Sequence, residues 1–158
     1  MADDPLHIES DPDPAVSHEL DELLYQYNVA QTGHTDGKQL AIIVRGPSGD
    51  LIAGLSGTTW SGWLDIRLLW VHERERGRGL GTQLLAAAEA EARARGCHTA
   101  IVDTHSFQAP DFYQRHGYRI YATLDGYPTG HSKVFLRKSL REHPAADEAA
   151  ADEATTER

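Results

Sequence analysis

A basic, glycine-rich turn between an apolar strand and a helix constrains the fold of this chain more than any other feature. An apolar run over residues 63–71 leads into HERERGRGLGT at residues 72–82, and helical apolar periodicity continues to residue 95. Several backbone N–H groups converge at such a turn, and the helix N-terminus adds partial positive charge. The segment therefore predicts a strand–turn–helix unit that holds a phosphate group.

Hydrophobic periodicity elsewhere predicts a mixed chain of helices and strands. We expect a short strand at residues 6–8 and a helix over residues 17–31 with Ser17 as its N-cap. Glu89 and Arg93 form an i,i+4 pair that we place on the outer surface of a later helix. Helices interleaved with hairpins predict an α/β or α+β fold with a mixed sheet. The other expected elements are strands at residues 39–45, 51–56, 63–71, 98–104, 118–124 and 133–140 and helices at residues 79–95 and 110–116.

Length and charge predict one domain with acidic ends. The chain has 158 residues, of which 40% are hydrophobic, enough to bury a core without disulfides. We expect a single domain over residues 1–140 and a disordered, acidic, Ala-rich tail over residues 141–158. The net charge is −9, but residues 23–140 hold thirteen Lys and Arg against ten acids, and 13 − 10 gives +3. The glycine-rich turn therefore lies in a cationic part of an acidic chain.

Composition also excludes several classes of partner. The acidic ends argue against nucleic-acid binding, which needs a basic face. No apolar run approaches the ~18 residues of a membrane span, and the N-terminus lacks the pattern of a signal peptide. The single cysteine, Cys97, rules out an intrachain disulfide and fits a reducing compartment. We therefore expect a cytoplasmic protein without nucleic-acid or membrane partners.

Three phosphate-binding motifs compete for the glycine-rich turn. The P-loop requires Gly-Lys-Ser/Thr, and no lysine stands here. The dinucleotide motif Gly-x-Gly-x-x-Gly fails because Gly81 comes one position early. The pattern Arg/Gln-x-x-Gly-x-Gly/Ala is met by Arg76, Gly79 and Gly81. Together with APDFYQRHGY at residues 109–118, this pattern resembles the GNAT superfamily of N-acetyltransferases, and the likeness extends over residues 39–140.

The resemblance implies a fold, a cosubstrate and its contacts. The fold is a mostly antiparallel central sheet, flanked by helices, whose fourth and fifth strands (here the expected strands at 63–71 and 98–104) splay apart. Acetyl-CoA is the implied cosubstrate, and no metal is implied. Many relatives carry an Asn where Phe107 stands, so we expect Gln108 to take over its contact. The other implied contacts are the main chain of Leu69 and Val71 and a pyrophosphate cradle formed by Arg76, Gly77, Arg78, Gly79, Leu80, Gly81 and Thr82.

Two side chains are candidates for the chemistry. Tyr113 matches the tyrosine that protonates the leaving thiolate in many members of the family, and packing in the core is its alternative role. Asp65 stands eleven residues before Arg76, the offset of the glutamate base in the histone-acetylating branch. Proton acceptor, substrate anchor and structural partner remain open roles for Asp65, and an ordered water is a further candidate for the base. Strand alternation predicts that Asp65, Arg67 and Leu69 share one face.

The resemblance favours an enzyme that moves an acetyl group from acetyl-CoA directly to a primary amine. A small-molecule acceptor, such as an aminoglycoside-like antibiotic or a polyamine, is the first expectation for a compact domain. A protein or peptide acetyltransferase that acts on a lysine or an N-terminus is the second. An acyl-CoA-binding sensor without turnover is an alternative of another class, against which Tyr113 argues. Relatives are often dimers, so a homodimer built through the final hairpin is also expected.

Overall fold

The computed structural model describes residue 6 and residues 8–141 and divides the chain into two units, Met1–Thr35 and Asp36–Arg158. Apart from its first residue, the expected tail lies outside the described residues, and the single domain over residues 1–140 stays a prediction. No helix in the described part of the chain is long and apolar enough to cross a membrane.

The first unit holds helix α1 (Pro14–Thr32). Asp13 caps it, with its side chain accepting a hydrogen bond from the Ala15 N–H at 2.9 Å. Ser17 lies inside the helix, so the prediction that it is the N-cap was wrong. The Asp13 carboxylate accepts a hydrogen bond from a backbone N–H that has no partner within the helix, and Pro14 suits the first helical turn. The strand expected at residues 6–8 was also wrong, since the described residues of that segment lie outside any strand. So short a segment, followed closely by two prolines, offers few ladder hydrogen bonds.

A six-stranded sheet forms the centre of the second unit, in the order β1-β2-β3-β4-β6-β5. The β3–β4 pair is parallel and the other neighbouring strands are antiparallel. This arrangement confirms the mixed sheet and the mostly antiparallel pairing. The strands are β1 (Lys38–Arg45), β2 (Leu51–Trp60), β3 (Trp63–Val71), β4 (Thr99–His105), β5 (Arg119–Asp125) and β6 (Ser132–Ser139); the helices are η1 (Glu73–Glu75), α2 (Leu80–Ala94) and α3 (Pro110–Arg115).

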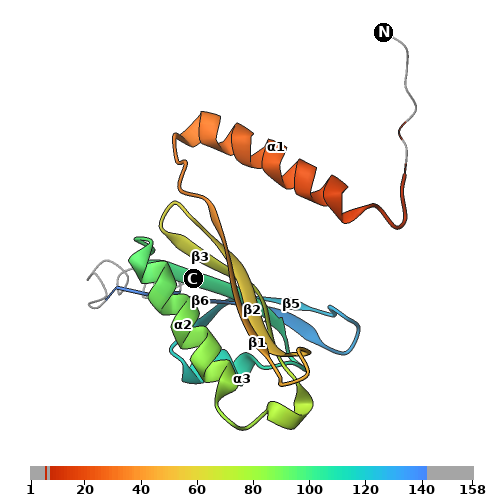
Figure 1. Cartoon of the computed structure of the whole chain (residues 1–158), viewed down its shortest axis with the longest axis vertical. Coiled ribbons are helices and arrows are strands. Elements are labelled where there is room, and N and C mark those ends of the chain that lie inside the picture. The colour runs from red at the N-terminus through yellow and green to blue at the C-terminus, as the bar shows by residue number, and fades with distance from the viewer. Residues whose placement is uncertain (1–5, 7, 142–158) are drawn as a thin grey trace, which may run out of the picture. The chain divides into compact units, whose positions relative to one another are not determined.

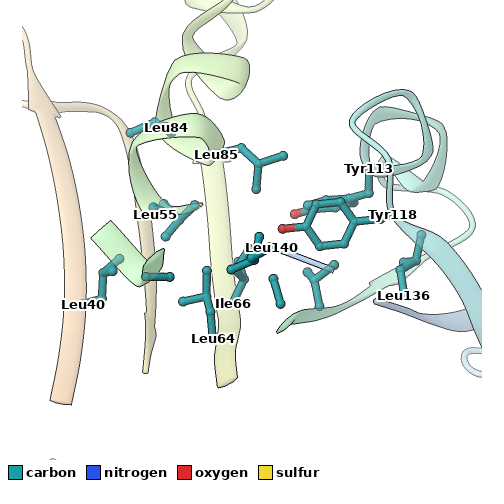
Figure 2. Packing of buried hydrophobic residues seen from close by; sticks show 14 of the residues in the cluster. Leu40, Leu55, Leu64, Ile66, Leu84, Leu85, Tyr113, Tyr118, Leu136 and Leu140 are labelled. Atoms are coloured by element: carbon teal, nitrogen blue, oxygen red, sulfur yellow. The ribbon is translucent and has the colours of Figure 1, made fainter. Parts of the chain in front are cut away.

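Helix α2 covers one face of the sheet. It packs on β1, β2 and β3, while α3 contacts β5 (Figure 1). The buried apolar residues of α2 recur at helical spacing, so they all point to the sheet; they are Leu84, Leu85, Ala88 and Ala92. Figure 2 shows Leu84 and Leu85 of α2 above Leu55 of β2, with the ring of Tyr113 from α3 beside them. The same core therefore joins the helix after the glycine-rich turn to the helix that carries Tyr113.

Glu89 is a charged residue inside this core. The residue is 5% exposed, and Lys138 Nζ donates to both of its carboxylate oxygens at 2.8 and 2.7 Å. Arg93 adds a longer contact at 3.4 Å. The expectation that Glu89 lies on the outer surface was wrong, because a partner from β6, far away in the sequence, makes the burial of its charge tolerable.

Strand β3 contains a bulge at Arg67. Its pairing with β2 shifts there: Ile66 lies opposite Gly57, and Leu68 already lies opposite Ser56. The extra residue reverses the faces of everything that follows. Leu69 therefore lies on the core side with Ile66, and the prediction that it shares a face with Asp65 was wrong.

Gly57 makes the bulge possible. A Cβ at this position would overlap the carbonyl oxygen of Asp65 and would lie 3.3 Å from the Ile66 Cα. Both atoms belong to the backbone of β3, which a side-chain rotation cannot move away. Only glycine therefore lets the two strands approach this closely.

The parallel pair β3–β4 separates just before the bulge. Its ladder runs from the pair Trp63 and Thr99 to the pair Ile66 and Val102 and then ends. Beyond that point β3 pairs only with β2, and β4 pairs only with β6. The predicted splay is thus confirmed, at the expected strands 63–71 and 98–104.

Candidate active site

A cleft of about 690 Å³ opens where β3 and β4 diverge. Its walls come from the end of β3, the glycine-rich turn, the start of α2, the end of β4 and helix α3. Two predicted site residues, Asp65 and Arg78, do not line it. The predicted residues that it brings together are Leu69, Val71, Arg76, Gly77, Gly79, Leu80, Gly81, Thr82, Gln108 and Tyr113.

The glycine-rich turn presents free backbone N–H groups to this cleft. Gly77 and Gly79 have φ of 74° and 82°, the left-handed region that favours glycine. The first hydrogen bond of α2 runs from Gln83 N–H to Gly79 C=O at 3.0 Å. The N–H groups of Leu80, Gly81 and Thr82 precede that bond, so they have no acceptor within the helix. Three donors at the positive end of a helix form a site for an anion.

The turn's arginines hold its shape. Arg76 Nε donates to the Val71 carbonyl at 3.0 Å, which ties the turn back to the end of β3. Arg78 pairs with Glu75 at 3.0 Å, and its side chain is 69% exposed. Arg76 therefore reaches the cleft from a fixed position, while Arg78 contributes charge from outside it.

The backbone of β3 turns toward the gap after the bulge. The His72 N–H donates to Ile52 C=O on β2, so by alternation Trp70 also faces β2 and the main-chain groups of Leu69 and Val71 face the β4 side. No β4 residue pairs with them, because the ladder has already ended. The Val71 carbonyl is taken by Arg76, whereas the groups of Leu69 are left for a ligand.

Tyr113 lies at the inner wall of the cleft. The residue is 6% exposed, and its ring makes edge contacts with Phe112 at 5.2 Å and Tyr118 at 5.7 Å. Figure 2 shows the hydroxyls of Tyr113 and Tyr118 pointing the same way. Burial raises the pKa of Tyr113 to about 12, with a further contribution from the charge of Asp103. Its hydroxyl therefore keeps its proton at neutral pH and is available as a donor.

Two carboxylates lie on the sheet face opposite α2. Asp65 is next to Ile101 in the β3–β4 ladder, and Asp103 follows two residues later on the same face of β4. Desolvation raises the pKa of Asp65; the charge of Arg67 opposes this rise and that of Asp103 adds to it. Asp103 lines the cleft, whereas Asp65 lies outside it. Sequence reasoning missed Asp103, whose only signal was a charge near the end of the splayed strand.

Comparison with known proteins decides the family. The Acetyltransferase (GNAT) family matches residues 4–118. An acetyltransferase of Agrobacterium fabrum, Atu2258, is 37% identical over 115 residues, which cover 73% of this chain and 84% of that protein. This chain belongs to the GNAT acetyltransferase family. It is an acetyl-CoA-dependent acetyltransferase, as the motifs of the turn and of helix α3 predicted.

Two further relatives agree with this assignment. The blasticidin-S acetyltransferase of Streptomyces morookaense is 48% identical over 96 residues, which cover 60% of this chain and 71% of that protein. The crystal structure of an acetyltransferase from Bacillus cereus matches with a TM-score of 0.68 at 34% identity, over 85% of this chain and 97% of that one. The GNAT fold therefore extends over most of the chain.

His116 links the turn of this acetyltransferase to helix α3. Its Nδ1 lies 2.7 Å from the Phe112 carbonyl, which can only accept, so Nδ1 carries a proton and donates. In the neutral ring Nε2 then accepts from the Thr82 hydroxyl at 3.1 Å. Sequence reasoning missed this residue, because its partner Thr82 lies 34 positions away. The link sets the distance between the turn and Tyr113.

Gln108 organises the loop after β4. Its Oε1 accepts from the Thr104 hydroxyl at 3.0 Å and from the His105 N–H at 2.9 Å. That oxygen is therefore occupied inside the loop, and the side-chain N–H groups of Gln108 are the part left for a ligand.

In the described residues, no three His, Cys, Asp or Glu side chains gather in a way that could hold a metal ion.

Proposed function

We propose that this acetyltransferase moves an acetyl group from acetyl-CoA to a primary amine of a small molecule. One observation carries the proposal: a single cleft contains the anion-binding turn, the unpaired backbone of Leu69 and the buried hydroxyl of Tyr113. A volume of about 690 Å³ suits a cosubstrate arm together with a small acceptor. Support for the acceptor class comes from the Streptomyces morookaense relative, which is named for an antibiotic substrate.

The residues of the cleft fit acetyl-CoA. The N–H groups of Leu80, Gly81 and Thr82 and the guanidinium of Arg76 would hold the pyrophosphate. The free main-chain groups of Leu69 would hold the pantetheine arm in the gap between β3 and β4. When bound, acetyl-CoA supplies the activated thioester.

Four groups of this chain act on the proton and the charge. The Leu69 N–H is directed to the gap, where it stabilises negative charge on an oxygen. Tyr113 holds a proton at its hydroxyl for a leaving group in the cleft. Asp103, which lines the cleft, attracts the ammonium form of the acceptor, and Asp65, outside the cleft on the same face of the sheet, takes its proton through one intervening water.

A thiol-release assay with acetyl-CoA tests this function. The acceptor panel contains aminoglycosides, polyamines, ring-bearing primary amines, and peptides with a lysine or a free N-terminus. We expect release with at least one of the small amines. Release with peptides only would replace the proposal by the protein-acetylating alternative. Binding of acetyl-CoA without release for any acceptor would identify a sensor.

Asp65→Asn should remove the acidic limb of the rate profile. A carboxylate accepts a proton only when ionised, so kcat/KM of the wild type falls as the pH drops through the raised pKa of Asp65. The variant cannot titrate at this position and should show a lower rate that no longer falls there. The measurement is kcat/KM against pH for both proteins. An unchanged profile in the variant would remove Asp65 as the base.

Thr82→Val should weaken the cosubstrate site with little effect on turnover. The substitution keeps the shape of the side chain but removes the hydroxyl that donates to His116. We expect KM for acetyl-CoA to rise by about two- to tenfold, the worth of one hydrogen bond. Thr123→Val on β5 is the matched control, since Thr123 is exposed and does not line the cleft. Equal KM values for both variants would contradict the role of the Thr82 link.

A further inference from the structure

Four aromatic side chains gather beside the cleft, and one of them, Phe107, lines it. This aromatic cluster consists of His105, Phe107, Tyr127 and His131. The rings of His105 and Phe107 are stacked with centroids 5.2 Å apart. Tyr127 makes an edge contact with His105 at 5.5 Å, and His131 makes one with Phe107 at 4.9 Å. The cluster thus joins the loop after β4 to the hairpin loop between β5 and β6.

Hydrogen bonds fix the two loops that carry the cluster. The Ser106 N–H donates to the Ser132 carbonyl at 2.8 Å, and the Ser132 N–H donates to the Ser106 hydroxyl at 3.1 Å. On the other side of Phe107, the Gln108 side chain accepts from the loop backbone at 2.9 Å. Phe107 is therefore held from both neighbouring positions, and its ring is a preorganised surface.

The cluster stays exposed even though hydrogen bonds hold both of its loops. Phe107 is 55% exposed and Tyr127 is 54% exposed. Large apolar rings held in the open at a cleft commonly contact a ligand. Phe107 itself lines the cleft, as does Asp103, whose carboxylate pairs with Lys133 at 2.8 Å. The nitrogen of Lys133 lies 5.7 Å from the centre of the Tyr127 ring, so charge and aromatic surface adjoin each other.

We propose that the aromatic cluster is a specificity subsite for the planar ring of the acceptor. The planar ring of an arylalkyl amine stacks on Phe107, while the neighbouring carboxylate of Asp103 attracts its ammonium group. Flat rings gain from such stacking beyond their buried area, and a puckered saturated ring of the same size does not. The inference rests on the proposed function and narrows its acceptor to primary alkyl amines that carry a planar ring.

Matched pairs of amines test this subsite. Phenethylamine and cyclohexylethylamine form one pair, and benzylamine and cyclohexylmethylamine form another. The measurement is kcat/KM by thiol release for each amine, expressed as the ratio of planar to saturated acceptor. Comparing this ratio between variants cancels the intrinsic difference in basicity within a pair. The variants are Phe107→Leu, Tyr127→Leu and, as control, Tyr121→Leu.

Tyr121 is a close control for Tyr127. Both tyrosines are 54% exposed and neither lines the cleft itself, but Tyr127 contacts His105 of the aromatic cluster, whereas Tyr121 lies on β5 and contacts Phe135. We expect the wild type to prefer the planar acceptor, and Phe107→Leu to reduce that ratio by about five- to tenfold. Tyr127→Leu should reduce it in the same direction, and Tyr121→Leu should leave it within about twofold.

The outcomes separate the subsite from the function. Turnover of small amines with no planar preference, or with a ratio that Phe107→Leu leaves unchanged, would overturn the subsite alone. Binding of acetyl-CoA without turnover of any small amine would overturn the proposed function and the subsite with it. An equal effect of Tyr121→Leu and Tyr127→Leu would show that the loss comes from general damage to the hairpin and would also overturn the subsite.

Discussion

Replacing Tyr113 by Phe should lower kcat by one or more orders of magnitude while acetyl-CoA still binds. The substitution removes only the hydroxyl, which in the wild type carries a proton because burial raises its pKa to about 12. Loss of a positioned proton donor typically costs about 10²-fold or more in rate. The ring remains, so its contacts with Phe112 and Tyr118 should keep helix α3 in place. Steady-state kinetics and calorimetric titration with acetyl-CoA give the two quantities.

Tyr118→Phe is the matched control for that variant. Tyr118 is 2% exposed, its ring lies 5.7 Å from that of Tyr113, and it does not line the cleft. Removing the Tyr118 hydroxyl should leave kcat within about twofold.

An acid acts only while protonated, so the high pKa of Tyr113 also predicts that its contribution to kcat does not fall between pH 7 and about pH 9. Wild-type turnover in Tyr113→Phe would overturn its role as the acid.

Replacing Gly57 by Ala should give the largest loss of stability among single methyl additions in the sheet. The added Cβ would overlap the Asp65 carbonyl oxygen, so β2 and β3 must move apart at the bulge. We expect a loss of about 2–4 kcal/mol, in the range of severe point substitutions. This corresponds to a fall in Tm of about 5–12 °C for a chain of this size. Thermal unfolding followed by circular dichroism measures it.

Gly81→Ala controls for the loss of a glycine as such. A Cβ at Gly81 would meet the Phe112 ring at 3.5 Å, an ordinary contact, and the position lies in the first turn of α2. Ala favours a helix by up to about 1 kcal/mol over Gly, so Tm should stay the same or rise. A Gly57→Ala protein with the Tm of the wild type would show that the strands at the bulge can separate freely.

The local elements were predictable because short-range signals specify them. Arg76, Gly79 and Gly81 lie within six residues of one another, and their backbone conformation follows from their own side chains or the lack of them. The helix after them repeats its apolar residues at one spacing. The splay of β3 and β4 followed from the resemblance that these motifs carried. Long-range partners carry no such signal in the sequence.

The errors at Glu89 and Leu69 arose from such long-range partners. Glu89 is buried because Lys138, on the last strand, reaches it. Leu69 changed face because Gly57, on another strand, accommodates one extra residue at Arg67. Alternation of side chains along β3 cannot reveal the extra residue at Arg67, because the strand pairing that accommodates it depends on another strand. The clustering of Phe107 with His131 was equally out of reach, since it depends on how two distant loops meet.

The bulge also divides β3 into two parts that tolerate variation differently. Before the bulge, Leu64 and Ile66 are fully buried, so substitutions at these two positions lower the stability of the fold. After it, Leu68 and Trp70 are 68% and 43% exposed, and both line the cleft. Substitutions at these two positions can therefore alter which ligands are accepted while the core stays intact. A single inserted residue thus gives this enzyme a stretch of strand on which new acceptor preferences can evolve at small cost in stability.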